Sequence, residues 1–202
     1  MSITLLVTGF GPFPGAPSNP TGSLVLRLAR RRRPAFADTR QITHVFPTSY
    51  VAIERELPEL IAKHRPNAIL MFGLAARTRH LRIETQARNA ISAVFADADG
   101  SKPAARILAK GCASLQVRAP VMRLLQAARA SRVPAKLSRD AGRYLCNALL
   151  WRALETKLVN GRPRVVVFVH VPQLRRDLAL KDLVRAGEAI MLAVLSAARR
   201  PR

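Results

Sequence analysis

A cysteine stands where a predicted turn becomes a predicted helix, and a thiol in that place is suited to act as a nucleophile. Asp140, Ala141 and Gly142 favour the turn, because aspartate and glycine tolerate backbone angles that other residues resist. The apolar residues between 149 and 154 recur at helical spacing. Cys146 would then lie in the first turn of the helix, where the partial positive charge of the helix N-terminus favours thiolate over thiol. The alternative for a lone cysteine is a small, buried, apolar side chain.

Two further side chains could complete the chemistry of an acyl transfer. His170 ends the strongest strand signal of the chain, and Glu84 lies in an extended segment where polar and apolar residues alternate. In open α/β sheets, sites form beyond the carboxyl ends of the strands, so both groups could meet Cys146 there. The histidine would share a proton with the thiol, and the carboxylate would orient the ring. If they do not meet, His170 is simply the end of a strand, and Glu84 is a surface partner of Arg82 or Arg88.

Apolar strands alternate with amphipathic helices along the chain, which predicts an α/β fold with a largely parallel central sheet. We predict strands or extended segments at residues 3–7, 41–46, 68–72, 80–93, 135–137 and 164–170. Besides the helix that carries Cys146, we predict helices from about residue 20 to before Pro34 and at 49–64, 121–129 and 180–198. On helix 121–129, Met122, Leu125 and Ala128 are expected to form the packing face.

Length and composition fit one globular domain over residues 1–202, because a chain of 202 residues, 49% of them hydrophobic, can bury a substantial core. The early apolar run at 3–7 is too short for a signal peptide or a membrane span. The two cysteines form no CxxC pattern, so reduced thiols in a cytoplasm are expected. The four histidines lack the spacing of a metal site, and no metal is predicted.

The first predicted strand is followed by glycines that suggest a nucleotide-binding loop. Gly9 and Gly11 supply the first two glycines, but Pro14 stands where the dinucleotide fingerprint needs the third. The loop also continues through several prolines instead of opening directly into a helix. We therefore predict no dinucleotide cofactor. Asn19 and Pro20 predict the helix start, since asparagine caps well and proline suits the first helical position.

The net charge of +22 raises the question of nucleic-acid binding. Only six of the 34 basic residues are lysines, and the arginines are spread along the chain instead of forming one binding element. The longest cluster, at 30–33, follows a predicted helix and would complement its negative end. Aromatic residues make up only 5% of the chain, and no aromatic-rich RNA-binding motif accompanies the charge. Nucleic acid is therefore the weaker alternative as a partner.

Four blocks of sequence, in order, resemble those of one enzyme family. They are TGFGPFPGAPSNPT at residues 8–21, RIETQARN at 82–89, SRDAGRYLCN at 138–147 and FVHVP at 168–172. Along nearly its whole length the chain resembles the pyroglutamyl peptidase I (pyrrolidone-carboxylate peptidase) family of cysteine peptidases. The resemblance implies a three-layer α/β/α fold of the phosphorylase/hydrolase-like kind. It also implies a homo-oligomer, either a dimer or a tetramer.

The resemblance implies an activity and assigns its residues. Cys146 would be the nucleophile, His170 the general base and Glu84 the third member of a triad. The reaction would release an N-terminal pyroglutamyl residue from a peptide with a blocked N-terminus, through a thioester and without metal or cofactor. Backbone N–H groups at the Cys146 turn are candidates for holding the oxyanion.

The substrate pocket keeps part of the family pattern. Phe10 and Phe13 match positions that wall the pocket for the lactam ring, and Asn19 would help to order that loop. Leu74 stands where the family usually has a glutamine associated with the lactam. Losing a side chain that hydrogen-bonds a buried substrate amide costs about 1–3 kcal/mol if nothing replaces it. The alternative for either phenylalanine is ordinary core packing.

Three other positions depart from the family pattern. Thr85 replaces an arginine that normally follows the glutamate, Val94 falls where another arginine is expected, and Pro14 replaces a glycine. Three functions therefore stay open. They are a pyroglutamyl peptidase, a cysteine amidase or aminopeptidase of the same family with another acyl specificity, and a catalytically degenerate basic binding protein on this fold.

Overall fold

A six-stranded mixed sheet forms the centre of the fold. The computed structural model describes residues 3–13, 15–104, 106–156 and 163–200. The strand order is β2-β1-β3-β8-β4-β7, and every neighbouring pair is parallel except β8 and β4. The strands are β1 (Ile3–Phe10), β2 (Thr39–Phe46), β3 (Ala68–Leu74), β4 (Leu81–Glu84), β7 (Ala135–Ser138) and β8 (Val165–Val171). The strand that comes last in the sequence, β8, therefore lies in the middle of the sheet.

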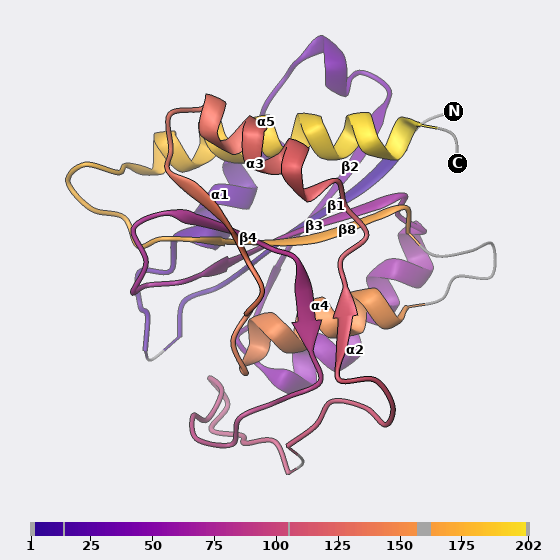
Figure 1. The fold of residues 1–202 in the computed structure, drawn as a ribbon, viewed down its shortest axis with the longest axis vertical. Coiled ribbons are helices and arrows are strands. Elements are labelled where there is room, and N and C mark those ends of the chain that lie inside the picture. Colours follow the sequence, from indigo (N-terminus) through magenta and orange to yellow (C-terminus); the bar gives the residue numbers. More distant parts are fainter. Residues whose placement is uncertain (1–2, 14, 105, 157–162, 201–202) are drawn as a thin grey trace.

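Helices cover both faces of the sheet, which makes three layers (Figure 1). One face carries α1 (Pro20–Ala29), α3 (Val121–Ala130) and α5 (Leu180–Arg199). The other carries α2 (Tyr50–His64) and α4 (Leu145–Glu155). The predicted α/β class with a largely parallel, mixed sheet is confirmed.

Burial on both faces explains why the central strands are almost wholly apolar. Along β1, Leu5 and Val7 pack into the core beneath α1, α3 and α5, whereas Leu6 packs into the core beneath α2 and α4. Successive side chains of a strand point to opposite faces, so a strand covered on both sides needs apolar residues at every position. The same reasoning applies to β8, in which all seven residues are buried.

Two helix starts follow from their capping residues. The Asn19 side chain accepts a hydrogen bond from the Thr21 N–H, which caps α1 as predicted. Ser49 caps α2 in the same way through the Ala52 N–H. Pro58 lies inside α2, eight residues after its first residue.

The structure corrects two expectations about local structure. The extended segment expected at 80–93 is broken at Thr85 into β4 and a short strand β5 (Gln86–Arg88), which pairs with β6 (Ser114–Gln116) in a separate two-stranded sheet. The alternating pattern runs through the whole segment, but pairing with different distant strands divides it between two sheets. On α3, Met122 is 56% exposed, whereas Leu124 is buried in the core. The buried face of this helix is therefore rotated relative to the expected one.

The long connection between β5 and β6 folds around a single amide side chain. Asn89 donates to the carbonyl oxygens of Ala109 and Cys112, and its own oxygen accepts from the N–H groups of Leu108 and Ala109. These four hydrogen bonds tie residues 108–112 to the residue that directly follows β5. None of the helices in the described ranges is long and apolar enough to cross a membrane.

Candidate active site

A buried histidine and a buried carboxylate contact each other near the middle of the sheet. His170 is the penultimate residue of β8, and Glu84 is the last residue of the adjacent strand β4. The antiparallel register places Arg82 opposite His170, which brings the end of β4 against the imidazole. His170 Nδ1 donates to Glu84 Oε1 over 2.8 Å. The structure therefore joins two of the predicted catalytic residues, and neither is at the surface.

Arg82 holds Glu84 from the other side. Its Nε lies 3.3 Å from Glu84 Oε1, and its Nη2 donates to Ser138 Oγ over 2.6 Å. The side chain of Arg82 therefore spans from β4 to the end of β7. Glu84 Oε2 is buried and has no hydrogen-bond partner among the described residues. The carboxylate is fixed through one oxygen shared by the imidazole and the guanidinium.

Cys146 lies in the first turn of α4, as predicted, and its side chain is partly buried. The side chain of the next residue, Asn147, accepts from Arg88 N–H and donates to the carbonyls of Arg88 and Ala90. These bonds fasten the start of α4 to β5. They fix where the thiol lies relative to the sheet.

The sulfur of Cys146 lies over a glycine beside His170. Gly73 on β3 pairs in register with His170, and a Cβ built on Gly73 would lie 2.7 Å from Cys146 Sγ. Burial acts to lower the pKa of His170, but the charge and hydrogen bond of Cys146, together with those of Glu84, outweigh it and raise the pKa to about 9. The imidazolium is thus the favoured form at neutral pH, which suits a partner that carries negative charge.

A small hollow adjoins the sulfur. It encloses about 60 Å³. Its walls are Phe10, Phe13, Asn19, Thr48, Leu74, Tyr144, Leu145 and Cys146. All four residues predicted to bind substrate are among them. Sequence reasoning missed Thr48, Tyr144 and Leu145, although the place of the last two directly before Cys146 was an available signal.

Hydrogen bonds hold the rim of this hollow. Asn19 Nδ2 donates to the Gly11 carbonyl over 2.9 Å, and Thr48 Oγ1 donates to the same oxygen over 3.3 Å. The Tyr144 hydroxyl donates to the Ala96 carbonyl over 2.8 Å. The loop after β1, the end of β2 and the connection after β5 are thereby joined around one opening.

Three other residues depart from the family pattern, and neither of the two that the structure describes, Thr85 and Val94, lines the hollow. Thr85 Oγ1 donates to the Ser138 carbonyl, so this residue ties β4 to β7. Val94 is 70% exposed and does not line the hollow. Pro14 lies outside the described residues.

Replacing Gly73 by alanine is expected to reduce activity strongly. The new Cβ would lie 2.6 Å from Phe168 Cζ and 2.7 Å from Cys146 Sγ, so the ring or the sulfur must move. Displacing a reacting atom by about 1 Å can cost about 100-fold in rate. The measurement is kcat/KM beside thermal unfolding.

Gly11→Ala is the matched control, because its Cβ would meet only the Phe46 carbonyl at an ordinary 3.7 Å. Full activity in the Gly73→Ala variant would contradict the placement of the sulfur over this glycine.

Comparison with known proteins gives one consistent result. The family model described as pyroglutamyl peptidase matches residues 3–196. A pyrrolidone-carboxylate peptidase of Thermococcus kodakarensis is 33% identical over 169 residues, which is 83% of this chain and 80% of the relative. One of Halalkalibacterium halodurans is 32% identical and covers 92% of this chain and 96% of the relative. The solved pyrrolidone carboxyl peptidase of Thermococcus litoralis superimposes with a TM-score of 0.87 at 25% identity, over 96% of this chain and 94% of that one.

Proposed function

The chain belongs to the pyroglutamyl peptidase family, and we propose that it removes an N-terminal pyroglutamyl residue from peptides with Cys146 as nucleophile. His170 is the acid and base, and Glu84 is the group that orients it. The observation that carries this proposal is the buried His170–Glu84 hydrogen bond beside a partly buried thiol at the wall of a small hollow.

The reaction follows from the order of these groups. The Cys146 sulfur attacks the pyroglutamyl carbonyl carbon, and the tetrahedral intermediate collapses when His170 donates its proton to the leaving amine. This leaves a thioester and the shortened peptide. His170, now neutral, takes a proton from water, which attacks the thioester and releases pyroglutamate. The sulfur and the imidazolium return to their starting forms.

The start of α4 supplies the donors for the oxyanion. The first N–H groups of a helix have no partner within the helix, and no side chain caps α4 at Tyr144. These groups lie beside the thiol because Cys146 is in that first turn. Donors of this kind contribute about 3 kcal/mol to the stability of a comparable transition state.

The size of the hollow favours a small acyl group. A water molecule needs about 10–15 Å³ of such space, so about 60 Å³ accommodates a compact ring but no long side chain. Phe10, Phe13 and Tyr144 supply aromatic walls, which suit the apolar methylene groups of a lactam ring.

A buried tyrosine hydroxyl belongs to a residue that packs against Tyr144, one of the walls of the hollow. The Tyr50 ring meets the Tyr144 ring edge-on at 5.8 Å, and its hydroxyl is buried without a partner among the described residues. Burial is the largest cause that raises the pKa of Tyr50, and electrostatic interactions with Tyr144, Asp97 and Cys146 raise it further, so the hydroxyl keeps its proton. Tyr50 does not itself line the hollow, so the neutral polar side chains at its wall that could meet a lactam in place of the missing amide are those of Asn19 and Thr48.

Steady-state hydrolysis of pyroglutamyl-aminocoumarin by the wild-type protein tests the function directly. Turnover of this substrate in preference to other N-acyl aminocoumarins supports a pyroglutamyl peptidase. Turnover of only another acyl substrate favours the amidase with altered specificity. No turnover of any member of the panel by a folded protein overturns the catalytic proposal.

Leu74→Gln is expected to increase the preference for pyroglutamyl over a cyclopentanecarbonyl substrate about tenfold. A side-chain amide at the wall of the hollow would hydrogen-bond the lactam, and one such bond contributes about 1.5 kcal/mol, close to a factor of ten. Leu74→Met, of similar length but without a donor, is the control. A fall in that preference with glutamine would contradict the placement of Leu74 against the ring.

The remaining expectations stay predictions. They are a single domain over residues 1–202, a cytoplasmic location, and a dimer or tetramer. Light scattering on the purified protein measures the oligomeric state, and fractionation of the source cells measures the location.

A further inference from the structure

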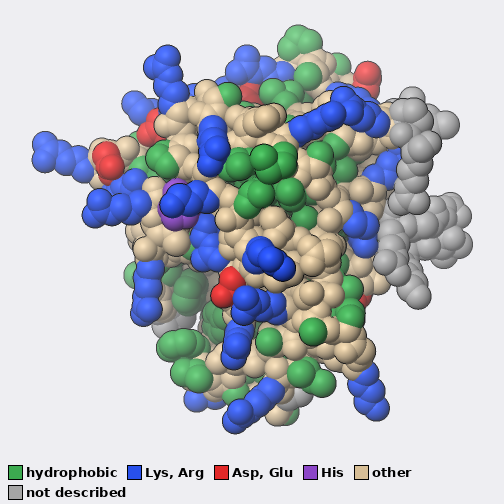
Figure 2. All heavy atoms as spheres, in the orientation of Figure 1, with side chains coloured by type: hydrophobic (Ala, Val, Ile, Leu, Met, Phe, Trp, Pro, Cys, Tyr) green, Lys and Arg blue, Asp and Glu red, His purple; other side chains and the backbone are tan. Residues whose placement is uncertain are grey.

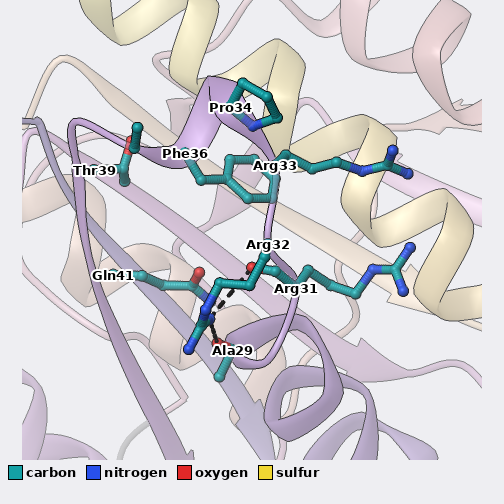
Figure 3. A pocket seen from close by; sticks show the side chains of 9 residues that line it. Ala29, Arg31, Arg32, Arg33, Pro34, Phe36, Thr39 and Gln41 are labelled. Atoms are coloured by element: carbon teal, nitrogen blue, oxygen red, sulfur yellow. Dashed lines mark hydrogen bonds between the residues drawn. The ribbon is translucent and has the colours of Figure 1, made fainter.

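A second, larger hollow lies at the amino end of the sheet. It encloses about 630 Å³, roughly ten times the volume beside Cys146. Two of its lining residues, Thr39 and Gln41, belong to the beginning of β2, whereas the catalytic residue His170 is near the carboxyl end of β8. The other walls come from the end of α1 and the segment after it, which includes the short helix Pro34–Phe36 (Figure 3). This hollow is therefore separate from the candidate active site.

Two of its arginines are held by one buried carboxylate. Arg31 Nη2 lies 2.8 Å and Arg33 Nε 2.5 Å from the two oxygens of Glu188 on α5, whose side chain is 5% exposed. The cluster at 30–33 was expected to complement the end of α1; Arg32 donates to the carbonyl of Ala29 there, and Arg31 and Arg33 also pair with a residue far along the chain. Two guanidinium groups share a single negative charge, which leaves the pair with a net positive charge.

Arg32 is fixed without a carboxylate partner among the described residues. Its Nη1 donates to the Ala29 carbonyl over 3.1 Å and to the Arg31 carbonyl over 3.4 Å, which folds the side chain back beside the hollow (Figure 3). Carbonyl groups position a guanidinium but do not neutralise it. The guanidinium of Arg32 is therefore held beside the hollow in a fixed orientation and keeps its positive charge.

The surroundings add a donor and an excess of positive charge. Gln41 Nε2 is buried and has no hydrogen-bond partner among the described residues, although Gln41 lines the hollow. Residues 29–41 contain five arginines and one acid, Asp38. Together with Glu188, the region carries two negative charges against five positive ones. A buried amide donor without a partner destabilises the protein, and a ligand oxygen that accepts from it would remove this cost.

We propose that this hollow binds a small phosphate-bearing ligand of the nucleotide type. Arg32 and the Gln41 amide would hold phosphate oxygens, because a guanidinium matches the geometry of phosphate and its charge here is not neutralised. The Phe36 ring, another wall, would pack against the planar base. The volume falls within the roughly 300–1,000 Å³ typical of small-molecule sites. This binding site goes beyond the peptidase function.

An arginine at another place on the surface provides a control that is matched in charge. Lysine and arginine side chains are scattered over the face drawn in Figure 2. Arg123 is exposed and lines a different hollow together with Arg118 and Arg164. Replacing Arg123 by alanine therefore changes the net charge by the same amount as Arg32→Ala, but at another place.

Calorimetric titration with ATP, inorganic phosphate and adenosine tests the proposal. ATP is expected to bind more tightly than either part alone. Arg32→Ala should weaken ATP binding about tenfold or more, the effect of losing one hydrogen bond to a charged group. Gln41→Leu should weaken it less, and Arg123→Ala should change it by less than about twofold. Pyroglutamyl hydrolysis should be the same in wild type and Arg32→Ala.

Two results would overturn the site. One is the absence of ATP binding to the wild-type protein. The other is an equal loss in Arg32→Ala and Arg123→Ala, whether the probe is ATP or a single-stranded oligonucleotide, because binding would then reflect the diffuse positive surface. Neither result depends on peptidase activity, so a failure here and a failure of the proposed function are distinguishable.

Discussion

Cys146→Ala is expected to abolish hydrolysis of pyroglutamyl-aminocoumarin, with a fall in kcat of about 10⁴-fold or more, while the protein stays folded. Removing the nucleophile of a comparable triad leaves only the catalysis that binding and the oxyanion donors supply. The Cys146 side chain is partly buried in the first turn of α4, and alanine is smaller and the strongest helix former, so it fits this place. The measurement is kcat beside the thermal unfolding curve.

The second cysteine is the control for this experiment. Cys112 is exposed, and its side chain lies outside the hollow beside Cys146. Cys112→Ser should therefore keep full activity. Iodoacetamide should modify Cys146 faster than Cys112 at neutral pH, because the catalytic thiol is the more reactive of the two. Turnover by Cys146→Ala, or loss of activity in Cys112→Ser, would remove Cys146 from its proposed role.

Glu84→Gln is expected to lower kcat about 10²- to 10⁴-fold and to change the pH profile. The glutamine keeps the shape of the side chain but loses the charge that orients the ring and stabilises the imidazolium. Glu84 and Cys146 raise the pKa of His170 to about 9 against the effect of burial. In the wild type, kcat/KM should therefore fall as the pH rises through about 9, because the imidazolium then loses its proton.

Without the carboxylate, one cause of the raised pKa is gone, so the alkaline limb should move to lower pH. The profile of kcat/KM against pH reports the free enzyme and measures this shift. Glu54→Gln is the control, because Glu54 is exposed and pairs with Arg152 on α4. An alkaline limb at the same pH in Glu84→Gln and wild type would show that Glu84 does not set the protonation of His170.

Local patterns predicted those parts of the fold that depend on local causes. The cap at Asn19 follows from side-chain geometry within three residues, and the strand that ends near His170 follows from an unbroken apolar run. The first turn of α4 at Cys146 follows from the same kind of signal. These features need no information from distant parts of the chain.

Contacts between distant residues were beyond the local patterns. The alternation around Thr85 continues without interruption, yet β7 and β6 draw its two halves into different sheets. The pairing of Arg31 and Arg33 with Glu188 joins positions more than 150 residues apart. Cys146, His170 and Glu84 were singled out by their positions and side-chain chemistry, and the resemblance of four sequence blocks assigned their catalytic roles, which stay predictions. No local sequence pattern pointed to Thr48 as a wall of the hollow. The parallel pairing of β1 and β2 brings this residue beside Gly11.

The position of β8 has a consequence for synthesis on the ribosome. Before residues 165–171 emerge, the nascent chain can form only two separate pieces of the sheet, β2-β1-β3 and β4-β7, because β8 is the strand that joins them. Pairings between residues far apart in sequence also form slowly. The thiol of Cys146 would therefore meet the imidazole of His170 only after residues 165–171 have left the ribosome.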